Sequence, residues 1–155
     1  MHQGTYVEKV LKHFYMDKAH PLSSPMVVRS FDVKKDPFRP QHDNEEILGP
    51  KVPYLNAIGI FMYLASHTRP DISFVVKCLA RYSSAPIKRH WNGVKHVLCY
   101  LQGTIDMGLF FQRTPVANLL GYADAGFLSD LHIAQSQMGY LFIYGGISIL
   151  WQYMK

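Results

Sequence analysis

Carboxylates are the first side chains to consider for chemistry, because metal ions and acid–base steps in proteins depend on them most often. Asp43, Glu45 and Glu46 form an acidic cluster in an irregular polar stretch. Such a cluster is able to bind a metal ion, although a solvated loop is its more common setting. Asp124 follows a short apolar run, which is typical of an aspartate at a strand end or in a turn. Neither feature assembles an active site by itself.

Basic side chains form a second group, and their spacing carries more information. Lys88 and Lys95 are seven positions apart, as are Arg89 and His96, so each pair would share one face of a helix. This face could follow the phosphates of a nucleic acid, or it could be an ordinary solvated face. The net charge of +5 and the isoelectric point near 9.2 permit a polyanionic partner without requiring one.

Several other kinds of site find no support in the sequence. Cys78 and Cys99 lie in apolar stretches without a CxxC motif or a histidine at ligand spacing, which indicates reduced thiols. Glycine-rich phosphate loops, GxSxG and HExxH are absent from the sequence. The longest apolar run, residues 57–65, is too short to span a bilayer, and no signal peptide opens the chain. We expect an intracellular protein, in the cytoplasm or nucleus, that binds neither a membrane nor a small-molecule substrate.

Helices must position the basic residues, because the first two thirds of the chain show a hydrophobic period near 3.6. Four are expected, at residues 5–16, 53–66, 69–82 and 86–103. The last has an apolar stripe that should face the core, formed by Trp91, Val94, Leu98 and Leu101. The second is apolar on nearly every face, so we expect it to be buried, with Gly59 allowing another helix to approach closely. Residues 27–51 are polar and irregular, which is typical of a linker or long loop.

Strands are expected after Gly103, where the hydrophobic period changes to two. They are predicted at residues 107–111, 119–124, 138–144 and 147–153. The pair Gly145-Gly146 separates the last two runs and supplies the positive φ angles that a tight hairpin needs. Helices followed by strands indicate an α+β fold.

A series of short motifs runs along almost the whole chain. Its central part consists of Val52-Pro53-Tyr54-Leu55-Asn56, Met62-Tyr63-Leu64-Ala65, Thr68-Arg69-Pro70-Asp71-Ile72, Leu79-Ala80-Arg81-Tyr82, His90-Trp91 and Lys95-His96-Val97-Leu98. Gly121-Tyr122-Ala123-Asp124-Ala125 and Ser136-Gln137 follow further on. At these offsets the sequence resembles the Pol polyprotein of copia-type (Ty1/copia) LTR retrotransposons, from the end of its reverse transcriptase into the start of its RNase H domain.

The resemblance implies a division of the chain into four parts. Residues 1–26 would hold a helix that follows the polymerase palm, and residues 27–51 a linker or long loop. Residues 52–111 would form a helical region like a thumb or connection, and residues 112–155 the first three strands of an RNase H-like domain. The expected fold is therefore an N-terminal helical region followed by an incomplete antiparallel RNase H-like sheet. Such a sheet would have an unpaired edge and an exposed apolar face.

The resemblance also implies where catalytic residues would lie. In this family paired aspartates hold two Mg²⁺ ions for polymerisation. Two such ions lie only about 4 Å apart and repel each other unless several anionic ligands bind them. The chain has no two adjacent aspartates, and the palm would lie before Met1. Asp124 would correspond to an RNase H metal ligand, yet no Asp or Glu occurs between Leu131 and Lys155 to complete that site. We expect Asp124 to be vestigial and this chain to need no cofactor, whereas the intact parent enzyme would use Mg²⁺.

Three functions remain open at this point. The first is a Pol fragment, from reverse transcriptase and RNase H, that is inactive alone but derives from a protein that holds an RNA/DNA template–primer duplex. Lys88, Arg89 and Lys95 would then be the phosphate contacts. The second is a small basic nucleic-acid-binding module without catalysis. The third is a structural partner that pairs its open sheet edge with an intact copy of Pol.

Overall fold

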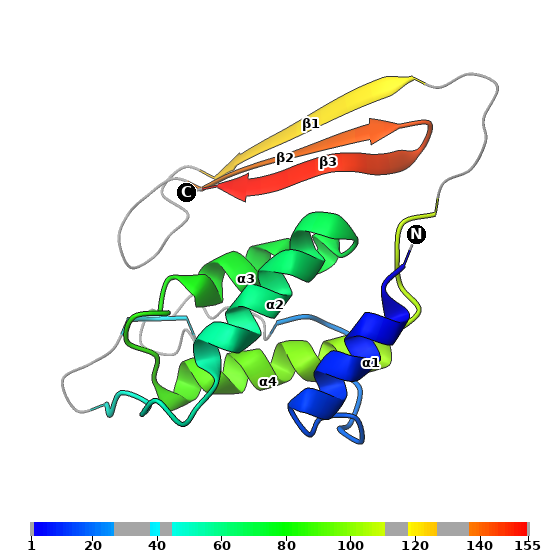
Figure 1. The fold of residues 1–155 in the computed structure, drawn as a ribbon. Helices are drawn as coiled ribbons and strands as arrows, with labels where there is room; N and C mark the ends of the chain where they lie inside the picture. The colour runs from blue at the N-terminus through cyan, green and yellow to red at the C-terminus, as the bar shows by residue number, and fades with distance from the viewer. Residues whose placement is uncertain (1, 27–37, 41–44, 111–117, 127–136, 155) are drawn as a thin grey trace.

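The computed structural model describes residues 2–26, 38–40, 45–110, 118–126 and 137–154. Within these ranges the chain forms the α-helices α1 (Gly4–His13), α2 (Tyr54–His67), α3 (Ser73–Ala80) and α4 (Lys88–Gly103), the 3₁₀ turn η1 (Pro70–Ile72), and the strands β1 (Leu119–Gly126), β2 (Gln137–Tyr144) and β3 (Ile147–Met154). The helices lie together on one side of the sheet (Figure 1). The predicted α+β class is confirmed. We call α1 to α4 together with η1 the helical region.

A single apolar core joins the four helices. Its fully buried members include Leu11 of α1, Phe61 of α2, Leu79 of α3 and Leu98 of α4. Phe38, from the stretch predicted to be a linker, is also in this core at 3% exposure. The helices therefore cover one another's apolar stripes, as amphipathic helices must.

The end of α1 comes three residues earlier than expected. The helix stops at His13, and Tyr15 takes the left-handed conformation with φ of 56°. The backbone N–H of Met16 then donates to the carbonyl of Leu11 over 2.8 Å, which closes the helix end. Tyr15 itself is 91% exposed, so nothing packs against its ring.

The prediction that α2 is buried is confirmed for one face of the helix and wrong for the other. Leu55, Met62 and Tyr63 are exposed along one face, while Phe61 and Leu64 on the other face are completely buried. The expectation for Gly59 was wrong as well, because no atom lies within 4 Å of where its Cβ would be. Close helix contact occurs elsewhere in the chain.

That contact is at Gly93, where α4 meets α3. A Cβ on Gly93 would lie 2.9 Å from the Cδ2 atom of Leu79. Any larger residue at this position would force the Leu79 side chain or the two helices to shift.

The start of α4 is shifted from the expected Pro86 to Lys88. Ile87 precedes the helix, and the ring of His90 accepts a hydrogen bond from the backbone N–H of Ile87 over 3.3 Å. The helix buries Val94, Leu98 and Leu101, three members of the apolar stripe that its sequence predicts.

The loop before α2 contacts the start of α4 and the residues that precede it. Ile47 forms an antiparallel bridge with Ile87, and the N–H of Leu48 donates to the carbonyl of Pro86 over 2.7 Å. Farther back, the hydroxyl of Tyr82 donates to the carbonyl of Phe38. We call residues 38–40 and 45–52 the strap.

The strands form an antiparallel sheet in the order β1-β2-β3. Gly145 and Gly146 have φ angles of 58° and 83°, which confirms the predicted hairpin. The strand expected at residues 107–111 was wrong for residues 107–110, where only Gly108 forms an isolated bridge with His2. Residue 111 lies outside the described residues.

The sheet contacts the helices through β3. The indole N–H of Trp151 donates to the carbonyl of Ala65 in α2 over 2.6 Å. The rings of Tyr153 and Phe74 meet edge to face with their centres 4.8 Å apart. Trp151 and Tyr153 therefore point towards the helices, and Leu150 and Gln152 away, because side chains alternate along a strand. An irregularity opposite Phe142 and Ile143 interrupts this alternation earlier in β3.

Candidate nucleic-acid interface

The sequence-predicted basic residues lie on α4, but the structure divides them into two groups. Lys88 and Lys95 are exposed, and Asn92 lies between them on the same solvent-facing side of the helix. The opposite side of α4 carries the buried residues of the core. Because seven residues of α-helix rise about 10 Å, the two lysines form a short positive stripe that points into solvent.

Arg89 belongs to the other group, because its guanidinium is engaged within the protein. Its Nη1 and Nη2 atoms lie 2.6 Å and 3.2 Å from the two carboxylate oxygens of Glu45. Nη2 also donates to the backbone carbonyls of Arg39 and Pro40. The structure therefore brings Arg89 to the strap, and only Lys88 and Lys95 point freely towards solvent.

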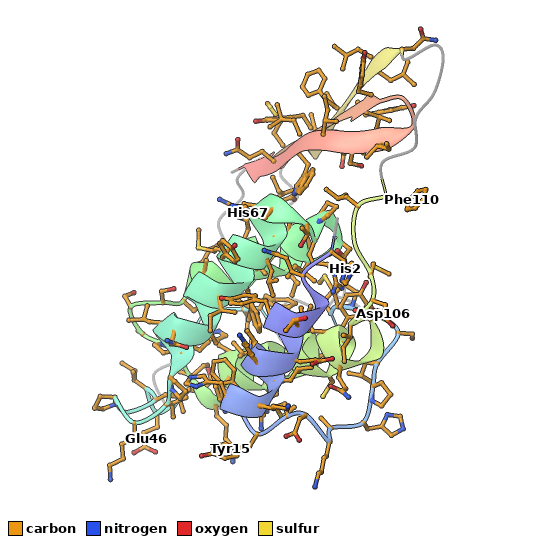
Figure 2. The ribbon with its side chains drawn as sticks, turned by 45° about the vertical axis from the view of Figure 1, so that its right-hand side comes forward. His2, Tyr15, Glu46, His67, Asp106 and Phe110 are labelled. Carbon is orange, nitrogen blue, oxygen red and sulfur yellow. The ribbon has the colours of Figure 1, made fainter. Side chains whose placement is uncertain are left out.

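Glu45 belongs to the acidic cluster of the sequence, and it is the member of that cluster that binds Arg89. Glu46 is exposed, and Figure 2 shows it at the end of the helical region farthest from the sheet. Asp43 lies outside the described residues. Among the residues that the structure describes, no group of three or more His, Cys, Asp or Glu side chains could hold a metal ion.

His90 is buried completely and cannot contact a phosphate. Its ring stacks on Tyr82 with the ring centres 3.8 Å apart. Burial lowers the pKa of His90 to about 4, so the ring is neutral at pH 7. Nδ1 accepts from the N–H of Ile87 and Nε2 lies 3.3 Å from the carbonyl of Arg39, an arrangement that places the proton on Nε2.

A buried polar network explains part of the Thr-Arg-Pro-Asp-Ile motif. Arg69 is 1% exposed, and its guanidinium forms a two-bond pair with Asp71, with its Nη2 and the Oδ2 of Asp71 2.7 Å apart. It also donates to the backbone carbonyl and the hydroxyl of Thr104, just beyond α4. This motif therefore ties η1 to the end of α4, and the part it plays here is structural.

Tyr100 completes that network. Its hydroxyl donates to Asp71 over 2.8 Å, and Arg69 lies 5.4 Å from the centre of its ring. Burial, and then the hydrogen bond to Asp71, raise the pKa of Tyr100, so the phenol stays protonated. Sequence reasoning missed this network because its members are up to 35 residues apart. The Arg-Pro-Asp spacing was the one local signal for it.

Asp124 lies in a pocket between the sheet and the helical region. It is paired with Gly139, which is in turn paired with Tyr153, so all three residues share a row on the helix-facing side. The pocket has a volume of about 300 Å³, and its lining is mainly aromatic and apolar, with Phe74 and Trp151 among its residues.

The pocket does not fit the Mg²⁺ ions that the resemblance implies. A two-metal site needs several carboxylates that converge, and Asp124 is the one carboxylate among the described residues that line the pocket. Asp130, the next acidic residue in the sequence, lies outside the described residues. We therefore derive no metal-dependent step from this site.

None of the described helices has both the length and the apolar composition that crossing a bilayer requires. Cys78 is buried, Cys99 is half-buried, and both are free thiols in the structure. The expectation of reduced cysteines agrees with this arrangement.

Comparison with known proteins shows where the sequence belongs. The retrovirus-related Pol polyprotein from transposon TNT 1-94 of Nicotiana tabacum is 39% identical over 97% of this chain and 11% of the polyprotein. That from transposon RE2 of Arabidopsis thaliana is 33% identical over 99% of this chain and 10% of the polyprotein. The secreted RxLR effector protein 161 of Plasmopara viticola is 43% identical over 67% of this chain and 73% of the effector.

No protein-family model and no solved structure matches the chain. The chain spans about a tenth of the length of the Pol polyproteins to which it is similar. The similarity to these polyproteins extends over nearly all of its 155 residues. The chain therefore belongs to the family of copia-type retrotransposon Pol polyproteins.

Proposed function

We propose that the chain is a non-catalytic piece of Pol, from the end of the reverse transcriptase into the start of RNase H, which binds the backbone of a nucleic-acid duplex. Lys88 and Lys95 on α4 would make the principal phosphate contacts. The RNA/DNA template–primer of the parent protein is the duplex we expect it to bind.

The observation that carries this proposal is the exposed positive stripe on α4. Lys88 and Lys95 are held in place by a helix whose opposite side is fixed in the core, so their positions are set before a ligand arrives. Along one strand of a duplex the phosphates rise about 3.4 Å each, so the stripe spans about three of them. Backbone contacts of this kind carry no base specificity.

The absence of catalysis is the second part of the proposal. Polymerisation needs paired carboxylates, and the sequence has no two adjacent aspartates. Hydrolysis by an RNase H site needs several carboxylates, and the described pocket supplies Asp124 alone. With purified chain and Mg²⁺ we expect neither primer extension nor cleavage of the RNA strand of a hybrid. Cleavage that disappears in the D124N variant would contradict this part.

The binding test is a titration of a fluorescent RNA/DNA duplex with the full chain at several salt concentrations. We expect the logarithm of the binding constant to fall linearly with the logarithm of salt, and K95Q to reduce the slope by about 0.9, the value for one phosphate contact. K77Q is the matched control, because Lys77 is also exposed but lies on α3. No binding at low salt, or an equal effect of the two variants, would refute the proposal.

A second function is favoured by the exposure of β1. Residues 119–125 are exposed on both faces of the strand, with Leu119 at 61% and Tyr122 at 55%. Among the described strands, β2 is the one paired with β1, on one of its edges. An open edge of this kind can accept a strand from another chain. Co-purification of the chain with intact Pol, and its loss in a variant with proline at Tyr122, would support such a partner role.

A further inference from the structure

Glu45 lies between two arginines at the start of α4. Its Oε1 atom is 2.6 Å from Nη1 of Arg89 and 3.1 Å from Nη2 of Arg39. Its Oε2 atom is 3.2 Å from Nη2 of Arg89. One carboxylate thus serves two guanidinium groups that the fold has brought together from positions 50 residues apart.

This carboxylate does not satisfy the two arginines. The Nη1 atom of Arg39 and the Nε atom of Arg89 are buried, and neither has a hydrogen-bond partner in the structure. Buried N–H groups of this kind are rare in folded proteins and call for an explanation. A backbone phosphate carries one negative charge, as a carboxylate does, but its oxygens are arranged tetrahedrally and not in one plane, so it can reach guanidinium N–H groups that the carboxylate leaves without a partner.

A ligand has room to reach this cluster. A cavity of about 440 Å³ is lined by Glu45, Glu46, Lys88 and Arg89, together with apolar residues of the strap and Ile87. Lys88, the first exposed lysine of the α4 stripe, forms part of its wall. Through Arg89 and Glu45, which both line it, the cavity connects the arginine cluster to the surface that carries Lys88.

The strap is attached to the start of α4 by the residues that follow Glu45. Ile47 is paired with Ile87 in an antiparallel bridge, and the N–H of Leu48 donates to the carbonyl of Pro86. Rotation of the Glu45 side chain would therefore remove the carboxylate from both guanidinium groups, while Leu48 keeps the strap attached at Pro86 and Arg89 keeps its hydrogen bonds to the carbonyls of Arg39 and Pro40.

We infer that Arg39 and Arg89 form a phosphate-binding site that Glu45 occupies when no nucleic acid is bound. A backbone phosphate displaces the carboxylate and extends the Lys88–Lys95 stripe by one contact. This inference rests on the proposed function for the source of the phosphate, although the site itself would also take a free phosphate ion. Glu45 then weakens nucleic-acid binding, because a phosphate must first displace its carboxylate.

A purely structural role for Glu45 is the alternative. The first turn of α4 contains Lys88, Arg89 and His90 and no acidic residue, although negative charge is favoured at a helix N-terminus. Glu45 supplies a negative charge near that position. Both roles predict that E45Q lowers the melting temperature, but only the phosphate site predicts a gain in phosphate binding.

The test compares E45Q with E46Q in the full chain. Glu46 lines the same cavity, makes no ion pair with Arg89, and changes the net charge by the same amount when it is replaced. We expect E45Q to bind the RNA/DNA duplex about 5- to 10-fold more tightly at low salt, with a salt slope steeper by about 0.9. E46Q should change the affinity less than about twofold, since exposed charges act weakly at a distance. The double variant E45Q/R89Q should lose the gain.

Equal gains for E45Q and E46Q would overturn the inference while leaving the proposed function intact. If neither variant nor the wild type binds duplex, the proposed function fails, and inorganic phosphate then decides about the site. At matched ionic strength, phosphate should raise the melting temperature of E45Q above its value in chloride, and should not do so for E45Q/R89Q. No such rise would overturn the inference. If E45Q fails to fold, E45D and E46D replace the pair, with the same ranking expected.

Discussion

The helical region and the sheet differ in how completely each is enclosed. In the helical region the apolar side chains of four helices cover one another, and a charged residue as deep as Arg69 has its partners in place. In the sheet, every residue of β1 from 119 to 125 is exposed. Leu150 on β3 is half-exposed on the side facing away from the helices.

The region that should provide most of the stability is therefore not the region in which the family resemblance places catalysis. The described structure contains a complete core for the helical region, so we expect that region to hold most of the free energy of unfolding. Asp124, the residue at which the family resemblance places catalysis, is on the most exposed strand. Marginally stable elements open locally before the whole chain unfolds, so the two regions should respond differently to the same kind of mutation.

The largest effect is expected for R69A. Removing the guanidinium leaves Asp71 and the carbonyl of Thr104 without their buried partner. Breaking a buried ion pair in this way costs about 4 kcal/mol, which would show as a lower midpoint in urea denaturation followed by circular dichroism. K77A, an exposed change, should stay within about 0.5 kcal/mol of the wild type. A small effect of R69A would show that the helical region is less well enclosed than we argue.

Truncating one leucine in each region tests the comparison directly. Leu98 in α4 is 0% exposed and Leu150 in β3 is 51% exposed. L98A should lower the free energy of unfolding by about 3 kcal/mol, because it leaves a cavity in the core. L150A should lower it by less than about 1 kcal/mol. Equal losses in denaturant titrations would contradict the proposed division of stability.

The pH dependence of stability should reveal His90. Its pKa is about 4 in the folded chain and near its ordinary value of 6.5 in the unfolded chain. Between these values the unfolded state binds more protons, so stability is full above pH 6.5 and falls as the pH is lowered. The expected loss is about 2 kcal/mol by pH 5.

H90Q is the matched variant for this measurement, because glutamine at the same position can also accept from the N–H of Ile87. The difference between wild type and H90Q, measured by urea unfolding at each pH, isolates the histidine from the acidic residues. An identical pH profile for the two proteins would show that His90 is not held neutral by the fold.

The contact between the two regions should give the smallest effect. W151F removes the indole N–H that donates to the carbonyl of Ala65 and keeps an aromatic ring at the site. A net loss of about 1 kcal/mol is expected for one hydrogen bond, seen as faster hydrogen exchange of the β3 amides with little change in α4. Y140F, which removes a hydroxyl that bonds to Gln152 on the exposed side of the sheet, serves as control and should change little.

Local pattern was sufficient to predict much of the fold. The stripe that includes Val94, Leu98 and Leu101 predicted the buried side of α4, and Gly145-Gly146 predicted the hairpin. These features depend on residues a few positions apart. The expected strand at 107–111 failed because an alternating run becomes a strand only where a partner strand lies beside it, and the described part, residues 107–110, has a single bridge to His2.

The candidate site was less predictable, for a related reason. The spacing of Lys88 and Lys95 was enough to place them on one exposed face. Arg89 shows the limit, because its partner Glu45 is 44 residues away and no local pattern predicts that pairing. A charge on the surface of an isolated helix can thus be taken up by a loop that packs against it, and only the tertiary structure shows which charges remain available.

The most direct test of the account is an NMR titration of the isotope-labelled full chain with an RNA/DNA duplex. We predict that the largest backbone amide shifts occur along α4 from Lys88 to Lys95, and that the amides around Asp124 in β1 change little. Shifts centred on Asp124, with α4 unaffected, would contradict the claim that this chain binds nucleic acid through its helices.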